Sequence, residues 1–245
     1  MGRTVVARPP ARGEDAERLA RLLEEVPPFS VLHPEELRIL ARKVRRNTFL
    51  RDEVIYREGE PSRSLCVIDR GQVKLTMTAA GGRERLVAIL GHGHIFGELE
   101  MFDGASRGMT ARAKDEVEAF VVDRHLVQAV LRTRPAFVRR LLELLARRLR
   151  RADQAAQDLV FFDAQTRLAR RLIDLAADHG TPEADPRRVR IGIRLTQEEV
   201  GQMIGVNRGS VNRALRALTA DGLIDWNGGL PVVLDISRLA EMARS

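Results

Sequence analysis

The sequence predicts an α+β protein with an N-terminal β-domain, a long central helix and a C-terminal winged helix-turn-helix. Three observations support this class. Short apolar stretches alternate with glycine turns between Thr48 and Val122, a heptad pattern follows Pro135, and two short helical patterns meet at Gly205.

The N-terminal half is expected to be helical first and then mostly strand. Residues 1–14 are rich in Pro and Arg and are expected to be disordered, whereas residues 15–45 predict helix with a break at Pro27-Pro28. The strand candidates that follow are EVIY, LCVID, VKLTM, RLVAIL and EAFVV. Their spacing and the glycines between them are typical of a β-sandwich or barrel.

The long helix after Pro135 carries an apolar seam. Its members recur at alternating steps of four and three: Val138, Leu142, Leu145, Leu149, Ala152, Ala156 and Leu159. A seam of this kind favours a parallel dimer, and the two alanines would let the paired helices approach closely. A helix packed only on its own domain is the alternative.

Residues 195–218 predict two short helices and a tight turn. Thr196 and Glu199 have capping-box spacing, Gly205 can end the first helix, and Asn207 can cap the second. Polar groups at the start of such a second helix can read base edges in a major groove. The candidate DNA-binding residues are Thr196, Gln197, Asn207, Arg208, Gly209, Ser210, Asn212 and Arg213. An ordinary helical hairpin with a solvated face is the alternative.

The flanking segments complete a winged helix. A helix over 166–179 is followed by GTPEADPRR, which is expected to be a loop, and by the strand VRIGIRL. Beyond the second helix, LIDW and LPVVLDI predict two strands joined at Asn227-Gly228, a strong hairpin signal. This wing is expected to lie along the phosphate backbone of DNA.

Composition favours a polyanionic partner. The 245 residues carry a net charge of +7, and eight arginines between Arg132 and Arg151 oppose one acid, Glu143. This basic run is either a solvated helix flank or a phosphate contact. No apolar run approaches the roughly 20 residues of a membrane span, and no signal peptide is evident, so a cytoplasmic protein is expected. The single Cys66 excludes an intrachain disulfide and is expected to be core.

The order of β-domain, heptad helix and winged helix resembles the CRP/FNR family of bacterial transcription regulators over about residues 20 to 240. Three segments carry the resemblance: GEPSRSLCVIDRGQVKL, GHGHIFGELEMFDGASRGMTARA and VGQMIGVNRGSVNRAL. It implies a homodimer with a cyclic-nucleotide-binding β-roll of the jelly-roll type, bound to a near-palindromic DNA site. RNA polymerase would be a further partner of an activator. The implied parts are a tail over 1–14, a sensor domain over 15–134, a dimerisation helix over 135–163 and a DNA-binding domain over 164–245.

The resemblance also implies an effector site. Gly97, Glu98 and Leu99 match the segment that holds the sugar and phosphate of a cyclic nucleotide, and Arg107 matches the family's phosphate-binding arginine. A guanidinium suits an anionic phosphodiester, and a carboxylate suits a ribose hydroxyl. The structural alternative is a loop that only closes the barrel.

Three departures from the family pattern stand out. Gly108 replaces a small hydroxyl residue that binds phosphate, and Ala152 and Asp153 replace hydroxyl residues that touch adenine, although Asp153 could accept from an amino group. The loss of two hydrogen bonds, at about 0.5–1.5 kcal/mol each, would lower the affinity for cyclic AMP some tenfold to a hundredfold. A different purine, another effector or ligand-free activity stay open. Gly209 replaces a glutamate that reads a base. This replacement would lower the discrimination between bases at one base pair by about 1–3 kcal/mol.

His92 and His94 raise a metal or haem alternative, because two histidines at i and i+2 on one strand share a face. Solvated loop histidines are favoured over that alternative, and no metal is expected. No P-loop or Ser/His/Asp signature indicates an enzyme. A regulatory subunit of an enzyme would not need the winged helix.

Overall fold

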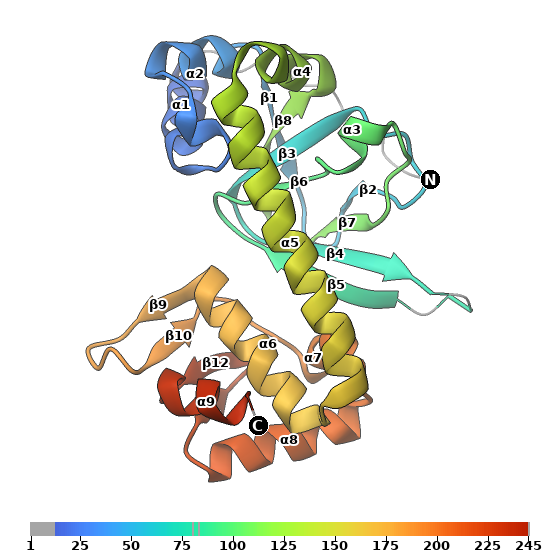
Figure 1. The fold of residues 1–245 in the computed structure, drawn as a ribbon, viewed down its shortest axis with the longest axis vertical. Coiled ribbons are helices and arrows are strands. Elements are labelled where there is room, and N and C mark those ends of the chain that lie inside the picture. Colours follow the sequence, from blue (N-terminus) through green and yellow to red (C-terminus); the bar gives the residue numbers. More distant parts are fainter. Residues whose placement is uncertain (1–12, 80, 83, 245) are drawn as a thin grey trace. The chain divides into compact units, whose positions relative to one another are not determined.

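The computed structural model describes residues 13–79, 81–82 and 84–244. Most of the expected tail over 1–14 therefore lies outside the described residues, and Glu14 already begins a helix. The chain divides into two compact units, one formed by 1–83 and 87–150 and the other by 84–86 and 151–245. The predicted α+β class, with an N-terminal β-domain and a C-terminal helix-turn-helix, is confirmed (Figure 1).

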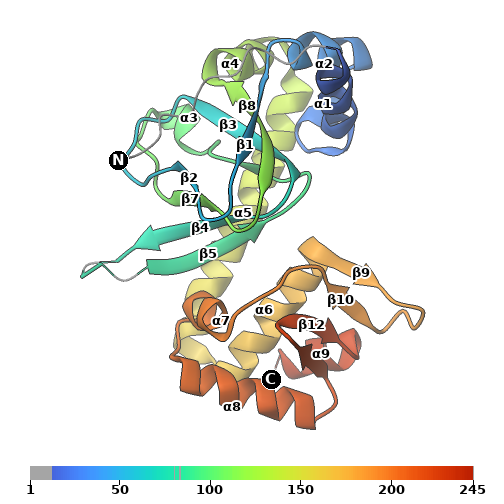
Figure 2. The same cartoon turned by 180° about the vertical axis from the view of Figure 1, so that it is seen from behind.

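The first unit begins with helices and continues as two antiparallel sheets. Helix α1 spans Glu14–Glu25, the 3-10 turn η1 spans Phe29–Val31, and α2 spans Pro34–Ala41. One sheet has the order β1-β8-β3-β6 and the other β2-β7-β4-β5. Figure 1 labels these strands, and Figure 2 shows the same sheets from behind. The strands are β1 Arg45–Phe49, β2 Val54–Tyr56, β3 Ser64–Arg70, β4 Val73–Thr78, β5 Glu84–Leu90, β6 Ile95–Phe96, β7 Thr110–Ala113 and β8 Val117–Asp123.

Two apolar clusters hold this unit together. Phe49, Ile68 and Phe96 belong to a cluster contributed by strands of both sheets, and all three side chains are buried. A second cluster joins α1 and α2 to residues of β3 and β8 and to the start of the long helix, with Phe29 and Phe137 in edge-to-face contact at 5.2 Å between ring centroids. The buried Cys66 lies in β3, as expected.

Three further helices follow in the chain. The short α3 spans Glu100–Asp103, α4 spans Arg124–Thr133, and the long α5 spans Pro135–Phe161. The division between the compact units falls inside α5, after Arg150. The sequence patterns did not predict α4, β1, β6 or β7. Strand β1 has the polar sequence RRNTF, and its pairing with β8 is supported by Arg46, whose guanidinium reaches Asp15 at 2.6 Å and also Glu118.

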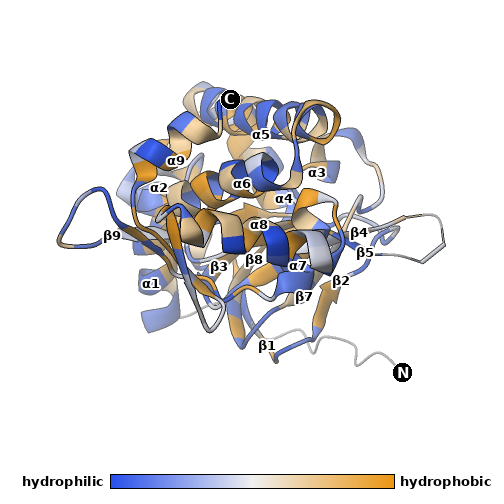
Figure 3. Ribbon diagram, turned by 90° about the horizontal axis from the view of Figure 1, so that it is seen from below, coloured by the Kyte–Doolittle hydropathy of each residue, from blue (hydrophilic) through white to orange (hydrophobic). Residues whose placement is uncertain are grey.

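The second unit is a helical core with a small sheet. Its helices are α6 Ala164–His179, α7 Gln197–Ile204, α8 Arg208–Ala220 and α9 Ile236–Met242. The sheet order is β11-β12-β10-β9, with β9 Gly180–Pro182, β10 Val189–Ile191, β11 Ile224–Asn227 and β12 Leu230–Val233. In Figure 3 the helices show both colours, as expected for amphipathic elements that bury one face.

Three sequence expectations for this unit were wrong in detail. The strand predicted over VRIGIRL ends at Ile191 as β10, and residues 192–195 are not strand. The stretch GTPEADPRR is not all loop, because Gly180–Pro182 pairs with β10 as a short edge strand, where proline is tolerated. The last strand ends at Val233 rather than continuing through Ile236. Asp235 follows it and caps α9 by accepting from Arg238 N at 3.0 Å. Among the described residues, no helix is long and apolar enough to cross a membrane.

Candidate functional site

The predicted effector residues of the first unit lie between β6 and β7. Glu98 and Arg107 are among the few buried charged residues, with 1% and 4% of their surface exposed. Gly97, Glu98 and Leu99 precede α3 rather than forming its first turn, because α3 begins at Glu100. Gly97 has a φ of +77°, a left-handed conformation that favours glycine.

Arg107 is fixed by three contacts. Nη1 donates to the Gly97 carbonyl and Nη2 to the Ser64 carbonyl, both at 2.6 Å. The guanidinium carbon lies 4.1 Å from the centroid of the Tyr56 ring, in a cation–π arrangement. Arg107 Nε is buried and has no hydrogen-bond partner among the described residues. A guanidinium carries five N–H donors, so three make no hydrogen bond to the described residues.

Glu98 is held by an arginine of the long helix. Arg148, from α5, forms an ion pair with Glu98 Oε1 and donates from Nη2 to the Ile95 carbonyl at 2.7 Å. Burial raises the pKa of the Glu98 carboxyl, and the charge of Arg148 opposes that rise. Within the described part of the chain, the buried Glu98 Oε2 has no partner. The carboxylate therefore keeps one acceptor for a hydroxyl donor.

Glu100 adds a second acid beside the arginine. Its Oε1 accepts from Gly108 N at 2.9 Å, and its Oε2 lies 3.6 Å from Arg107 Nη1. Gly108 is thus brought to the site through its backbone. Three residues that the sequence did not single out, Tyr56, Glu100 and Arg148, complete this cluster. The one sequence signal was the position of Arg148 inside the basic run.

Asp153, predicted to touch adenine, is an exposed residue of α5. It belongs to the second compact unit, as does Ala152. The site described above is built entirely from the first unit, so the structure does not place Asp153 in it. The role of Asp153 stays a prediction.

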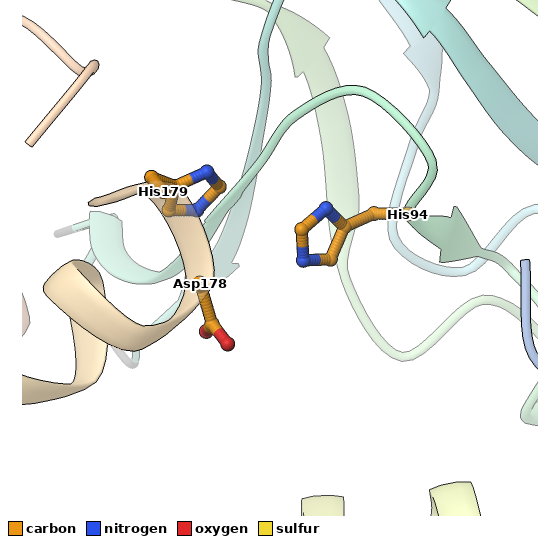
Figure 4. A group of neighbouring side chains, drawn as sticks. All are labelled: His94, Asp178 and His179. Atoms are coloured by element: carbon orange, nitrogen blue, oxygen red, sulfur yellow. The ribbon is translucent and has the colours of Figure 1, made fainter. Parts of the chain in front are cut away.

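The two histidines lie on a turn before β6 and not on one strand, which is a correction. His92 Nδ1 is 2.6 Å from the Asp69 carbonyl oxygen, and His94 Nδ1 is 3.2 Å from that of Gly91. Figure 4 draws His94 with Asp178 and His179, which end α6. Since His94 belongs to the first unit and the other two to the second, no shared site is assigned to them.

The helix-turn-helix forms as its sequence predicts. Thr196 Oγ1 accepts from Glu199 N at 3.1 Å, and the Glu199 carboxylate accepts from Thr196 N at 2.9 Å, which closes the capping box. Gly205 ends α7 with a φ of +71°. Asn207 Oδ1 accepts from Ser210 N at 2.9 Å and caps α8.

The solvent face of α8 gathers the predicted DNA-binding side chains. Arg208, Gly209 and Arg213 are exposed, whereas Ser210 and Asn212 are half-buried. Side-chain bonds link this face: Arg208 Nε donates to Gln197 Oε1 at 3.3 Å, and Arg213 Nη2 to Ser210 Oγ at 3.0 Å. The opposite face of α8 is buried through Val211, Ala214, Leu215 and Leu218. The N-terminal end of α8 is therefore exposed to solvent.

The heptad seam of α5 is largely uncovered in the single chain. Leu142 and Leu149 are 60% and 64% exposed, and Leu159 is 38% exposed. Ala152 and Ala156 are exposed, while Val138 and Leu145 are half-buried. Leu145 packs against the helical cluster of the first unit, so the seam is partly an intrachain contact. Its exposed leucines remain open to a partner.

The basic run over residues 132–151 contains arginines with and without an acidic partner in the chain. Four of its arginines form ion pairs with acids: Arg134 with Glu36, Arg140 with Glu143, Arg148 with Glu98, and Arg151 with Asp178. The other four, Arg132, Arg139, Arg147 and Arg150, are exposed and have no ion pair among the described residues. Half of the arginines in the run are therefore engaged within the chain, and the other half are left to contact a polyanion.

Comparison with known proteins agrees with both halves of the fold. The cyclic nucleotide-binding domain family matches residues 46–134, and the Crp-like helix-turn-helix domain family matches residues 166–242. The structure of FixK2 from Bradyrhizobium japonicum superposes with a TM-score of 0.71 at 24% identity, covering 81% of this chain and 96% of that one.

Two curated relatives are similar over most of the chain. The CRP-like cAMP-activated global transcriptional regulator of Mycobacterium tuberculosis is 37% identical over 216 residues, which is 88% of this chain and 96% of the relative. The Cyclic AMP receptor protein of Thermus thermophilus is 30% identical over 217 residues, 89% of this chain and 96% of the relative. The chain belongs to the CRP/FNR family and is a DNA-binding transcription regulator, not an enzyme.

Proposed function

We propose that this regulator is a homodimer whose DNA affinity is controlled by cyclic AMP bound in the β-roll. The observation that carries the proposal is the presence of two buried charged groups in the first unit, each with polar atoms that make no hydrogen bond to the described residues. Glu98 keeps a buried carboxylate oxygen without a partner among the described residues, and Arg107 keeps three N–H donors. A ribose hydroxyl and a phosphodiester are the complementary groups. The relatives' names support cyclic AMP as the effector.

Arg148 connects this site directly to α5. A hydroxyl that donates to Glu98 Oε2 would stabilise the ionised carboxylate. It would thereby change the strength of the ion pair between Glu98 and Arg148. Because Arg148 lies on the helix that carries the exposed leucines, the site and the proposed dimer interface share one continuous helix. An effector acts here by preferring one of two arrangements of that helix.

We propose that the exposed leucines of α5 pair two chains in parallel. A dimer would present two α8 helices to successive major grooves about 34–36 Å apart on a near-palindromic site. Affinity should fall steeply with rising salt, since arginines displace counterions from phosphate. Gly209 offers no side chain to a base, so the base pair opposite it should be weakly selected. Such a protein would act in the cytoplasm and, as an activator, would contact RNA polymerase.

Calorimetry with cyclic AMP and cyclic GMP, paired with DNA-binding titrations, tests the effector assignment. Cyclic AMP should give saturable heat and raise affinity for the specific site. Arg107→Ala should abolish both effects, whereas Arg139→Ala removes an exposed charge that has no ion pair among the described residues and should leave both intact. No heat up to millimolar nucleotide, together with unchanged DNA binding, would refute cyclic nucleotide control.

One observation favours a second candidate, a β-roll that works without an effector. Glu98 already has an arginine partner, and two donors of Arg107 are already used by carbonyls of the chain. In that case the purified protein would bind its site with full affinity, and Arg107→Ala would change stability but not DNA binding. The same titrations separate the two candidates.

A further inference from the structure

A pocket opens in the first unit, at the start of α4. Its volume is about 400 Å³, and it is lined by Ser62, Arg63, Asp123, Arg124, His125 and Gln128. None of these residues belongs to the cluster around Glu98 and Arg107. The segment before β3 supplies two of them, and the junction of β8 and α4 supplies the rest.

The charge of the pocket is positive. Arg63 is exposed and Arg124 is half-buried, and neither forms an ion pair within the described residues. The acid of the pocket, Asp123, is already engaged, since Arg45 Nη2 donates to its Oδ1 at 2.8 Å. Two guanidinium groups and an imidazole therefore line a site whose one carboxylate is shared with a cation outside it.

The helix end adds donors to the same place. Asp123 occupies the N-cap position of the ten-residue α4, but its side chain makes no capping bond and is bonded to Arg45. The first turn of α4 contains no acidic residue. The first backbone N–H of α4, that of Arg124, donates to the Arg63 carbonyl oxygen at 2.9 Å. The backbone N–H groups that follow it, and the partial positive charge of a helix N-terminus without a side-chain cap, suit an anion.

Two buried polar atoms of the pocket residues are unsatisfied. Ser62 is only 7% exposed, and its Oγ has no hydrogen-bond partner among the described residues. The same is true of Arg124 Nε. Buried polar groups are normally paired, and leaving one unpaired is destabilising, so these atoms indicate a missing partner.

We propose that this pocket binds the phosphate monoester of a small hydroxylated metabolite, such as a sugar phosphate. A phosphomonoester carries about two negative charges near neutral pH and three acceptor oxygens, which matches two arginines, a hydroxyl and helix amides. A volume of about 400 Å³ exceeds that of a bare phosphate and falls within the usual range for small-ligand sites. Asp123 and Gln128 provide an acceptor and an amide for hydroxyl groups. The pocket would take this ligand whether or not a cyclic nucleotide controls the protein.

Calorimetry with glucose 6-phosphate, inorganic phosphate and glucose tests the proposal on the full-length protein. Glucose 6-phosphate should bind saturably, inorganic phosphate more weakly, and glucose not at all. Saturating cyclic AMP should not displace the sugar phosphate. Arg124→Met and Arg63→Met should each weaken binding at least tenfold, and Ser62→Ala should weaken it several-fold.

Arg139→Met is the matched control, because it removes the same charge from an exposed arginine of α5 and should change affinity less than twofold. Arg63 is exposed, so Arg63→Met keeps the test valid if Arg124→Met does not fold. The proposal is overturned if glucose 6-phosphate gives no saturable heat, or if cyclic AMP displaces it. It is also overturned if Arg63→Met and Arg139→Met lower the affinity for glucose 6-phosphate equally. Equal affinity for inorganic phosphate and glucose 6-phosphate would overturn the part assigned to the sugar.

Discussion

Replacing Gly97 by alanine should displace the arginine at the centre of the effector site. A Cβ at Gly97 would lie 2.5 Å from Arg107 Nη1 and 3.1 Å from its Cζ. Arg107 cannot move away freely, since two carbonyls and the Tyr56 ring hold it in a buried position. The substitution therefore forces either the guanidinium or the Gly97 loop out of place.

The expected cost has two parts. A non-glycine residue in the left-handed region costs about 1–2 kcal/mol. Loss of the bond from Arg107 to the Gly97 carbonyl adds about 1.5–3 kcal/mol, the usual value for a charged hydrogen bond. Gly104→Ala is the matched control, because Gly104 has a φ of +76° but, its chain neighbours aside, no atom of the described residues lies within 4 Å of the place that its Cβ would take. The difference between the two variants should then be about 1.5–3 kcal/mol.

Denaturant unfolding followed by circular dichroism measures that difference. The near-ultraviolet signal of Tyr56, the single tyrosine of the chain, should change in Gly97→Ala and not in Gly104→Ala. If cyclic AMP uses Arg107, its affinity should fall roughly 10- to 150-fold in Gly97→Ala, the same free energy expressed as binding. Equal destabilisation by the two alanines, with an unchanged Tyr56 signal, would refute the proposed displacement.

Three further outcomes are expected. Leu149→Glu should shift the sedimentation coefficient to that of a monomer without lowering the thermal midpoint of the single chain, because Leu149 is 64% exposed; a variant that stays dimeric contradicts the seam. Arg208→Ala should reduce specific DNA binding by about 1–3 kcal/mol in a fluorescence titration, whereas Arg238→Ala on α9 should not; equal losses would mean a general charge effect. Cys66 should resist thiol reagents at pH 8 in the native protein and react on unfolding, because burial raises its pKa to about 12 and keeps it protonated; rapid native labelling would contradict this.

The helix-turn-helix could be predicted almost residue by residue because its determinants are local. Thr196 and Asn207 cap helices through bonds to residues three positions along the chain, and Gly205 supplies a left-handed turn. Short-range rules of this kind depend on sequence spacing alone. The order of elements and the exposed seam of α5 followed from periodicity in the same way.

The effector cluster could be predicted only in part because its contacts are long-range. Arg148 reaches Glu98 across 50 positions of the chain, and Arg107 reaches Ser64 across 43. No local pattern marks such pairs, so Arg148 stood out only as one charge in a basic run. Strand β1 was missed for a related reason: its charged side chains are neutralised by acids from α1 and β8, which are distant in sequence.

The division of the chain inside α5 has a consequence for limited proteolysis and for dissecting the protein. Domain boundaries commonly fall in exposed linkers that proteases cut, but here the boundary after Arg150 lies within 27 continuous helical residues. Trypsin meets several arginines around this point, yet a helical backbone does not fit a protease cleft without local unfolding. Cleavage at Arg150 and Arg151 should therefore report how often the helix opens. A fragment that ends there would also carry only part of the apolar seam, from Val138 to Leu149, so it should dimerise less tightly than the intact chain.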